Sequence, residues 1–484
     1  MKADAALCVF GWLLAGLSLC MFVPALGALI AADLELAQVF FNSAVVSSFF
    51  AGVLIISLRG KEAELTRRGS LLLTFLAWTI LPIFAAMPFY FSGVIFSPGH
   101  ALFEAVSGFT TSGATILTHL DRQPAAVLVW RALLQWLGGL FTVIAASGIF
   151  AVLGIGGFQV QYASMPHGGG QTLFGRLRQI SRALLSIYAV LTLLCLVSFW
   201  AAGMPIFDAF CHALSTVSTG GFSTRDASLG AFKSPLVEGV AAVFMILGAM
   251  NLALHWSAAN GRWRGYSLDP EARYLGAAIF AAIFSVYVMV LISGYKTGTG
   301  ALHWALFNGV SFLTTTGYWT GNIAGAPLGV GLILLAAILV GGSTGSTGGG
   351  FKAMRVGLVI RQGWLELARL VSPNEVLRLR YGGAGVKETQ IAAVWAVFTG
   401  FSFVLALGTI LIGLTGPTFE QSFSIAAAAL SNSGPAAALF FTDPVTPYAS
   451  LAESTRALAM IGMIAGRMEV LALLILLSPA FWRD

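Results

Sequence analysis

The chain consists mainly of long apolar stretches, which short polar segments ending in glycine interrupt at four places. The apolar stretches recur at about the 20-residue length that crosses a bilayer as a helix. The interruptions place hydroxyl or amide side chains before glycine, at Thr110–Thr115, Val217–Gly221, Thr314–Tyr318 and Ser431–Pro435. Non-helical backbone at membrane depth is tolerated only where it is buried in protein or lines a cavity. We therefore interpret the four interruptions as four walls of one pore.

The apolar pattern repeats four times after two N-terminal spans, at residues 6–30 and 38–58. Each repeat is predicted to be a spanning helix, a short helix, a polar glycine loop and a second spanning helix. The short helices, about 11–14 residues long, cannot cross the bilayer and are predicted to be re-entrant. The predicted boundaries are 1–68 for the two N-terminal spans and a cytoplasmic loop, and 69–182, 183–272, 273–387 and 388–484 for the pore repeats.

The loop glycines provide an alignment of the repeats. Ten residues before Gly113, Gly220 and Gly317 stand Phe103, Phe210 and Phe307, and Ser424 has that place before Gly434. Pro98 and Pro205 stand fifteen residues before the first two glycines, where they suit the start of a short helix. This register predicts that the four glycines are equivalent.

Composition and charge place the chain among all-α polytopic membrane proteins. Of its 484 residues, 57% are hydrophobic and 10% are charged, whereas a soluble domain carries about 25% charged residues. Most of the 26 lysines and arginines fall on one side of the predicted spans, which the positive-inside rule assigns to the cytoplasm. The short helices and loops then enter from the outer face, and ten full spans result. The net charge of +6 is thus a topology signal, and no nucleic-acid partner is expected.

The loops have the chemistry of an ion filter. An alkali cation that loses its water needs replacement oxygen ligands, which rings of backbone carbonyls supply in potassium channels. Glycine accepts the backbone angles that direct successive carbonyls toward one axis, and hydroxyl groups add ligands or brace the loop. The candidate ion-binding residues are Thr110, Thr111, Ser112, Gly113, Val217, Ser218, Thr219, Gly220, Thr314, Thr315, Thr316, Gly317, Ser431, Asn432, Ser433 and Gly434.

The predicted short helices also carry acidic residues and a histidine. Glu104, Asp208 and Glu420 are expected either to brace the loops or to stabilise helix N-termini, and they are not in register with one another. His212 is interpreted as a packing residue, because the histidines show no metal-ligand spacing.

The helix, pore loop and helix repeated four times in one chain resembles the TrkH/KtrB/HKT superfamily of potassium transporters over nearly its whole length. The additional N-terminal spans and the closing run, 466–470 through 478–483, look like the TrkH/TrkG branch. The resemblance implies a pseudo-fourfold arrangement of the repeats with the four aligned glycines in the filter. In relatives that admit sodium the first glycine is often serine, so Gly113 favours potassium.

A second glycine-rich run interrupts the second span of the third repeat. Its residues are Gly341, Gly342, Ser343, Thr344, Gly345, Ser346, Thr347, Gly348, Gly349 and Gly350. Because each helical glycine costs about 1 kcal/mol, the span should be broken here. A phosphate-binding loop is excluded, since Phe351 precedes Lys352 and Ala353 follows it. A small-residue packing surface is the other alternative, but the run is too dense for that alone. The resemblance implies an intramembrane loop that obstructs the pore below the filter.

Two basic residues in the membrane complete the predicted gate. A charge such as Arg467 costs at least about 2.5–3.5 kcal/mol on insertion scales, so a functional role is the default hypothesis. The alternative is an arginine paired with an acid at a helix interface, although Glu469, two residues away, lies on a different helix face. Lys352 either lines the pore or extends to the cytoplasmic interface. The resemblance implies that Arg467 projects into the pore.

The predicted function is potassium uptake across the bacterial inner membrane, with K⁺ as transported ion and no bound cofactor. The segment 355–387 is either a solvated cytoplasmic helix or a docking surface. The resemblance implies a homodimer, embedded in membrane lipid, that a cytosolic nucleotide-binding ring (TrkA-like) regulates. No catalytic constellation is visible, so an enzyme is not expected. The alternatives are a sodium-permeable or cation-coupled symporter, a carrier of organic solutes, and an assembly subunit without transport activity.

Overall fold

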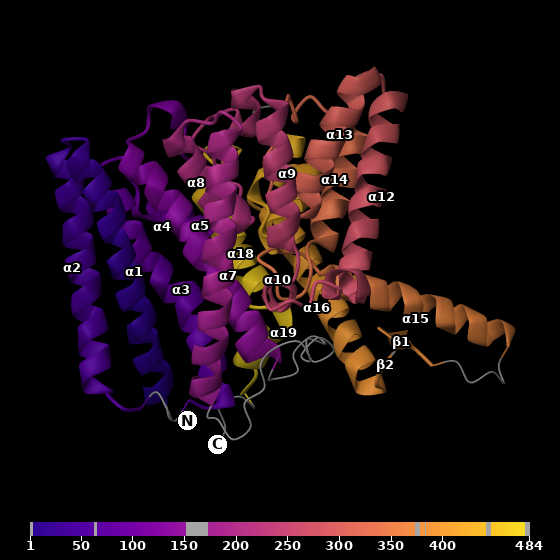
Figure 1. Cartoon of the computed structure of the whole chain (residues 1–484), viewed down its shortest axis with the longest axis horizontal. Helices are drawn as coiled ribbons and strands as arrows, with labels where there is room; N and C mark the ends of the chain where they lie inside the picture. Colours follow the sequence, from indigo (N-terminus) through magenta and orange to yellow (C-terminus); the bar gives the residue numbers. More distant parts are fainter. Residues whose placement is uncertain are drawn as a thin grey trace.

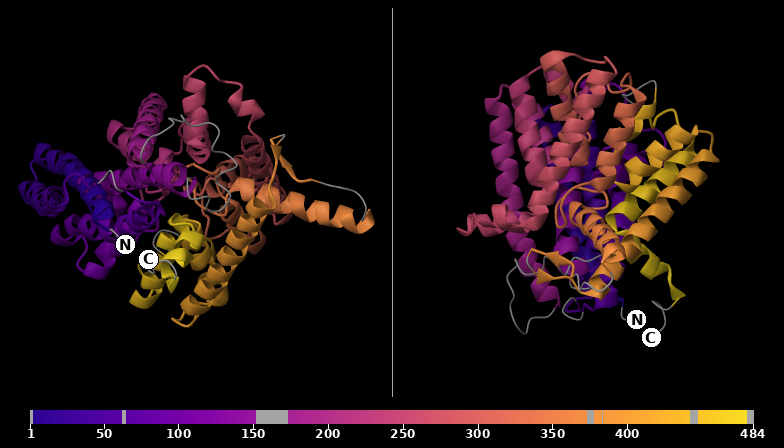
Figure 2. Two further views of the ribbon diagram at one scale, coloured as in Figure 1. Left: turned by 90° about the horizontal axis from the view of Figure 1, so that it is seen from below. Right: turned by 90° about the vertical axis from the view of Figure 1, so that its right-hand side faces the viewer.

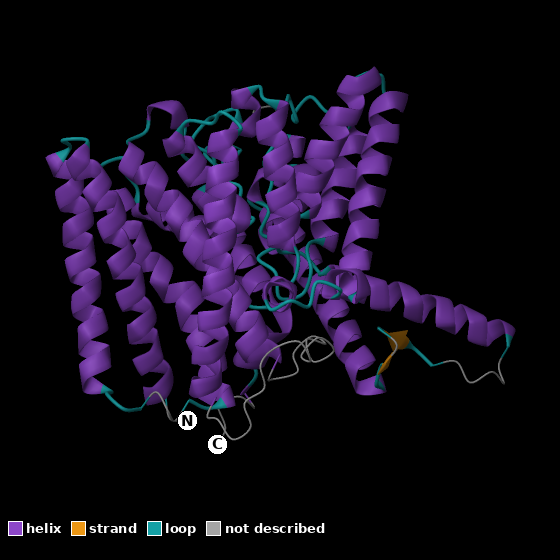
Figure 3. Cartoon of the chain, viewed as in Figure 1, coloured by secondary structure: helices purple, strands orange, loops and turns teal. Residues whose placement is uncertain are grey.

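The computed structural model describes residues 3–61, 65–151, 173–372, 378–382, 384–441 and 447–479. Within these ranges the chain is a bundle of helices that lie side by side, with one hairpin of two-residue strands (Figures 1 and 3). Parts of two segments discussed above, 373–377 and 480–483, lie outside the described residues. The all-α fold predicted from the sequence is confirmed.

The two N-terminal spans form a hairpin at the edge of the bundle (Figure 1). They are α1 (Asp4–Ile30) and α2 (Leu34–Ser57). Asp33 caps α2 by accepting a hydrogen bond from the Leu36 amide at 3.0 Å. Gly11 lets the helices approach, since a Cβ atom there would lie 3.0 Å from Leu54 Cβ. Most of the outer surface of α2 is apolar and exposed, as a lipid-facing helix requires.

The four repeats follow in chain order. The first contains α3 (Arg67–Phe91), α4 (Pro98–Phe109), η2 (Leu120–Arg122), α5 (Ala125–Ala145) and η3 (Ala146–Phe150). The second contains α7 (Leu173–Ala201), α8 (Ile206–Val217), η5 (Ser228–Phe232), α9 (Pro235–Ala249), α10 (Leu252–Ala259) and α11 (Gly265–Leu268). The third contains α12 (Pro270–Ile292), α13 (Gly298–Leu313), α14 (Leu328–Val340), α15 (Ala353–Val371), β1 (Arg380–Tyr381) and β2 (Ala384–Gly385). The fourth contains α16 (Glu388–Gly413), α17 (Phe419–Leu430), η6 (Gly434–Phe440), α18 (Glu453–Arg467) and α19 (Val470–Leu477).

The spans differ in continuity. Among the described residues, 7 helices are long and apolar enough to cross a membrane by themselves. Two more spans, predicted to be continuous, are bent pairs: α9 and α10 meet at 96°, and α18 and α19 at 102°. The tenth predicted span is the broken one, of which α14 is the apolar part. The bends form at Asn251, whose side chain caps α10, and at Glu469, which has a φ of +57°.

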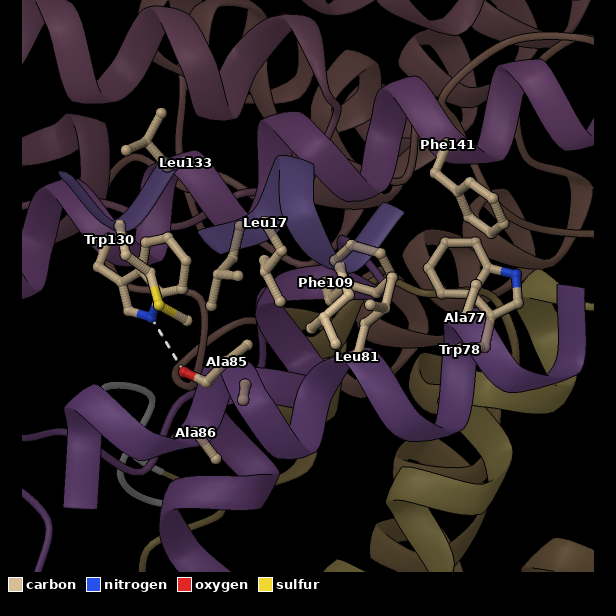
Figure 4. Packing of buried hydrophobic residues seen from close by; sticks show 14 of the residues in the cluster. Leu17, Ala77, Trp78, Leu81, Ala85, Ala86, Phe109, Trp130, Leu133 and Phe141 are labelled. Atoms are coloured by element: carbon tan, nitrogen blue, oxygen red, sulfur yellow. Dashed lines mark hydrogen bonds between the residues drawn. The ribbon is translucent and has the colours of Figure 1, made fainter. Parts of the chain in front are cut away.

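Aromatic side chains fill the space between the N-terminal hairpin and the first repeat (Figure 4). Trp78 of α3 contacts Phe109 and Phe141, with ring centroids 5.1 Å away in both cases. Trp130 of α5 is fully buried and donates a hydrogen bond to the Ala85 carbonyl at 3.0 Å. This packing holds the first short helix, α4, against its neighbours.

Glycines on the second spans allow close contact with the ends of the short helices. A Cβ atom at Gly138 would lie 1.7 Å from the Phe109 carbonyl oxygen, and one at Gly466 would lie 2.2 Å from that of Leu430. Gly248 makes the corresponding approach to Val217, at 2.8 Å. The second spans therefore support the carboxyl ends of the short helices through direct backbone contact.

We expect Gly138→Ala to lower the yield of folded protein strongly, because the added methyl group would overlap a backbone carbonyl that cannot move without displacing α4. The matched control is Gly276→Ala on α12, where a Cβ atom would meet nothing within 4 Å. The measurement is the monodisperse fraction and the melting temperature of each variant in detergent. Equal values for the two variants would show that the close approach is dispensable.

Candidate functional site

The short helices α4, α8, α13 and α17 are each followed by the same backbone turn. The first residue after each helix is its C-terminal cap: Thr110, Ser218, Thr314 and Ser431. The second has a φ between +50° and +60°: Thr111, Thr219, Thr315 and Asn432. The third donates its amide to the carbonyl five residues earlier, at 2.8 to 3.0 Å: Ser112, Gly220, Thr316 and Ser433. The pseudo-fourfold repeat therefore extends to individual hydrogen bonds.

This turn corrects the predicted alignment in the second repeat by one residue. Val217 is the last residue of α8, and Gly220 has the third place in the loop. Gly221, with a φ of +80°, is the residue that corresponds to Gly113 and Gly317, with φ of +76° and +79°. The segment predicted from Val217 to Gly220 was therefore placed one residue too early.

The error arose where the second short helix begins. Pro98 is the first residue of α4, whereas Pro205 is the cap that precedes α8. Cys211, and not Phe210, therefore corresponds to Phe103. With a glycine at both candidate positions, the sequence contained no local signal for choosing between them.

The four loops contact one another in a closed ring. A Cβ atom at Gly113 would lie 2.2 Å from the Gly220 carbonyl oxygen, and one at Gly221 would lie 1.9 Å from that of Thr316. Gly317 faces Pro435 of the fourth loop, with 3.0 Å to its Cδ. The Gly434 amide closes the ring by donating to the Ser112 carbonyl at 2.5 Å.

The loop residues are almost completely shielded from the surface. Gly434 differs from the other three glycines because it begins η6 and lacks a positive φ. Glycine is required at this position because a side chain would clash with the first loop: a Cβ atom there would lie 2.3 Å from the Ala114 amide nitrogen. The structure thus brings all four interruptions together at one place, as four walls require.

Glu104 braces the first loop from α4. Its buried carboxylate accepts hydrogen bonds from Thr115 Oγ1 at 2.9 Å and from the Ile116 amide at 3.1 Å. Arg131 of α5 pairs with the same carboxylate, at 2.8 Å from Nε to Oε1, and both side chains are at most 1% exposed. The Arg131 guanidinium also donates to the Ser223 carbonyl at 3.2 Å. The pair therefore ties the first loop to the second.

The positions equivalent to Glu104 have the same role in two other repeats. His212 Nε2 lies 3.0 Å from Ser223 Oγ, and Asn308 Oδ1 accepts from the Thr320 amide at 3.4 Å. The fourth repeat has Ile425 here and lacks the brace. His212 is thus a polar brace rather than only a packing residue. The sequence alone does not reveal this set of braces, because the residue type changes from acid to imidazole to amide.

The other two acids on the short helices differ from each other. Asp208 accepts from Thr224 Oγ1 at 2.5 Å and pairs with Arg225 at 2.8 Å, which anchors the outer segment after the second loop. The hydrogen bond from Arg225 to Asp208 raises the pKa of the Arg225 guanidinium. Glu420 is exposed in the first turn of α17 and braces nothing in the described structure.

The run between α14 and α15 is a buried loop that contacts the carboxyl ends of the short helices. Thr347 Oγ1 donates toward the carbonyls of Gly248 and Val217, at 2.9 and 3.1 Å. The Gly349 amide donates to Thr315 Oγ1 at 2.7 Å. A Cβ atom at Gly349 would lie 1.9 Å from the Ser431 carbonyl oxygen. The loop therefore meets the second, third and fourth repeats, and the predicted break in this span is observed.

Arg467 lies at the end of α18 and joins this loop to the first repeat. Nε donates to the Thr110 carbonyl at 2.6 Å, Nη1 donates to the Thr347 carbonyl at 2.7 Å, and Nη2 donates to Thr111 Oγ1. The side chain is 4% exposed. The negative ends of the helix dipoles of the surrounding short helices favour a cation at this place.

The charged residues near Arg467, Glu469 and Lys352, have partners of their own. Glu469 pairs with Arg355 of α15 at 2.7 Å, so it is not the partner of Arg467. Lys352 is 7% exposed, and its ammonium group turns back to the Gly348 carbonyl instead of extending to the cytoplasmic interface. A further acid, Glu271 of α12, accepts the Thr344 amide at 2.6 Å and was not singled out from the sequence.

Below the ring, the described residues enclose a small space. A cavity of about 20 Å³, enough for about one water molecule, is bordered by Lys352, Arg467 and Glu469 together with residues of α5 and the buried loop. Above the ring, a second cavity of about 30 Å³ is lined by Gly113, Gly221 and aromatic side chains. One small cavity therefore lies on each side of the ring.

Comparison with known proteins identifies the relatives of this chain. The family model TrkH, described as a cation transport protein, matches residues 36–483. The Trk system potassium uptake protein TrkH of Salmonella typhimurium is 36% identical over 476 residues, which is 96% of both chains. The TrkG protein of Escherichia coli K12 is 31% identical over 474 residues, again 96% of both.

A solved structure resembles the whole chain. The crystal structure of the potassium transporter TrkH from Vibrio parahaemolyticus superposes with a TM-score of 0.90 at 35% sequence identity, covering 100% of both chains. Together with the apolar helices, these relatives establish a multi-pass protein of the bacterial inner membrane. The relatives are transport proteins, which agrees with the prediction that the chain is not an enzyme.

Proposed function

The chain belongs to the TrkH family of cation transport proteins, and from that membership we propose that it takes up potassium ions through a pore formed by the four loops. The observation that carries this proposal is the closed ring of loops, one from each repeat. The potassium uptake named for the relatives supports the choice of ion.

The proposed filter consists of the first four loop residues of each repeat. These are 110–113, 218–221, 314–317 and 431–434, which differ from the predicted set by the exchange of Val217 for Gly221. Carbonyl oxygens at this depth can replace the hydration shell of a cation. The hydroxyl groups of Ser431 and Ser433, buried and without a hydrogen-bond partner in the described structure, are additional oxygens of the same kind. The membrane potential would supply about 2.3 kcal/mol per charge per 100 mV.

The proposed gate is the buried loop 341–350 with Lys352 and Arg467. Its support is the position of both basic groups below the ring, next to a space for about one water molecule. A cation that left the filter toward the cytoplasm would meet a fixed positive charge and a closed backbone segment. Conduction therefore requires the loop and Arg467 to move away together.

Regulation is proposed to come from outside this chain. Helix α15 projects sideways from the bundle, away from the chain termini (Figure 2), and exposes Trp364, Leu367 and Val371. Such a face suits a protein contact, either with a second copy in a homodimer or with a cytosolic nucleotide-binding ring. The chain contains no dinucleotide-binding fingerprint, so nucleotide sensing would belong to that partner.

The ion preference is tested by reversal potentials of purified protein in liposomes with potassium on one side and sodium on the other. We expect potassium to permeate better than sodium in the native chain. Gly113→Ser should lower that preference, because the added Cβ atom would lie 2.2 Å from the Gly220 carbonyl oxygen and would displace it. Equal permeability in the native chain would favour a sodium-permeable pore. Absence of any ion flux would favour an assembly subunit.

The gate is tested by Arg467→Ala and by deletion of 346–349. Both changes should raise potassium flux several-fold without changing the reversal potential. They remove the obstruction, while each filter turn keeps its own backbone hydrogen bond to the carbonyl five residues earlier. Arg369→Ala, on the exposed part of α15, is the control for loss of a positive charge. Native flux in both gate variants would refute the gating role.

A further inference from the structure

Gln135 of α5 contacts the second loop although it belongs to the first repeat. Its amide group is fully buried. Nε2 donates to the Gly220 carbonyl at 2.7 Å, and Oε1 accepts from Ser215 Oγ at 2.5 Å and from the Phe222 amide at 3.1 Å. One side chain thus holds the end of the short helix, the loop and the segment after the loop.

The contact explains why the second loop alone has two consecutive glycines among the four loops. Gly221 is required by its backbone, with a φ of +80°. Gly220 has no such requirement, but a Cβ atom there would lie 2.3 Å from Gln135 Cδ. Because Gln135 is hydrogen-bonded on three sides, it cannot yield to a methyl group. Gly220 is therefore the residue that lets Gln135 reach the loop.

The carbonyl that Gln135 holds lies at a joint of the ring. The Gly220 oxygen faces Gly113, which is how the second loop meets the first. The corresponding carbonyl in the first loop, that of Ser112, is held by the Gly434 amide at the joint with the fourth loop. At the contact between the first and fourth loops, the donor to the carbonyl is a backbone amide. At the contact between the first and second loops, the donor is the side chain of Gln135.

We propose that Gln135 is a positioning residue for ion discrimination, which it maintains by fixing the Gly220 carbonyl at the joint between the first and second loops. The inference rests on the proposed function of the ring as a potassium filter. Selectivity in such filters depends on the number and orientation of the carbonyl dipoles that face the ion. Without the Nε2 donor, the Gly220 carbonyl is free to rotate, and the ring can adapt to a smaller cation.

The test uses Gln135→Met, which preserves length and removes all three hydrogen bonds, and Gln135→Glu at a pH that ionises the carboxyl group. The ionised carboxylate keeps the acceptor for Ser215 and Phe222 and cannot donate to the Gly220 carbonyl. The matched control is Gln123→Leu, because Gln123 is a half-buried glutamine whose amide donates to the Thr118 carbonyl, away from the ring. The measurement is the permeability ratio of potassium to sodium from reversal potentials of the full chain in liposomes.

We expect the ratio to fall about fivefold in Gln135→Met, because only the bond to the Gly220 carbonyl, out of the three that are lost, bears on the ring, and one hydrogen bond corresponds to about fivefold. The ratio should fall in Gln135→Glu as well. Gln123→Leu should match the native ratio. A native ratio in both Gln135 variants would overturn the inference while the potassium filter stands. A native chain that does not discriminate would instead refute the proposed function. Should Gln135→Met fail to fold, the result for the near-isosteric Gln135→Glu decides.

Discussion

The structure depends on how the chain satisfies backbone polar groups that it exposes at membrane depth. Four loops and one broken helix place many amides and carbonyls outside helical hydrogen bonding. Each such group would cost several kcal/mol of folding free energy if it had no hydrogen-bond partner at this depth. The chain meets this constraint by making the interruptions partners of one another. The Gly434 amide bonds the Ser112 carbonyl, and the Gly349 amide bonds the Thr315 hydroxyl. The loops are thus stable only as a set, which explains why all four repeats converge.

The same constraint links the proposed filter to the proposed gate. Arg467 donates to oxygens of both Thr110 in the first loop and Thr347 in the buried run. Movement of the run would therefore release contacts at the base of the ring. A coordinated cation or a water molecule would then have to satisfy those oxygens. The proposed filter and the proposed gate therefore share one hydrogen-bond network.

Much of this arrangement could be predicted from the sequence, because it is expressed in local patterns. The spacing of apolar runs and polar breaks predicted the spans, the short helices and the broken third repeat. The predicted alignment of the second repeat was wrong at Gly220 and Gly221, which only the backbone separates: the Gly220 amide bonds the Ser215 carbonyl, and Gly221 has a φ of +80°. The braces at His212 and Asn308 and the contact of Gln135 with Gly220 were also beyond reach. They join residues through space, and the residue types at equivalent positions share no pattern.

The central claim is that the closed ring of four loops binds the transported ion. Anomalous scattering from crystals grown with thallium or rubidium, as substitutes for potassium, tests it most directly. The account predicts anomalous peaks inside the ring, between the loops that contain Gly113, Gly221, Gly317 and Gly434. An ordered ring without a peak at saturating ion concentration, with ions bound only elsewhere in the protein, would contradict it.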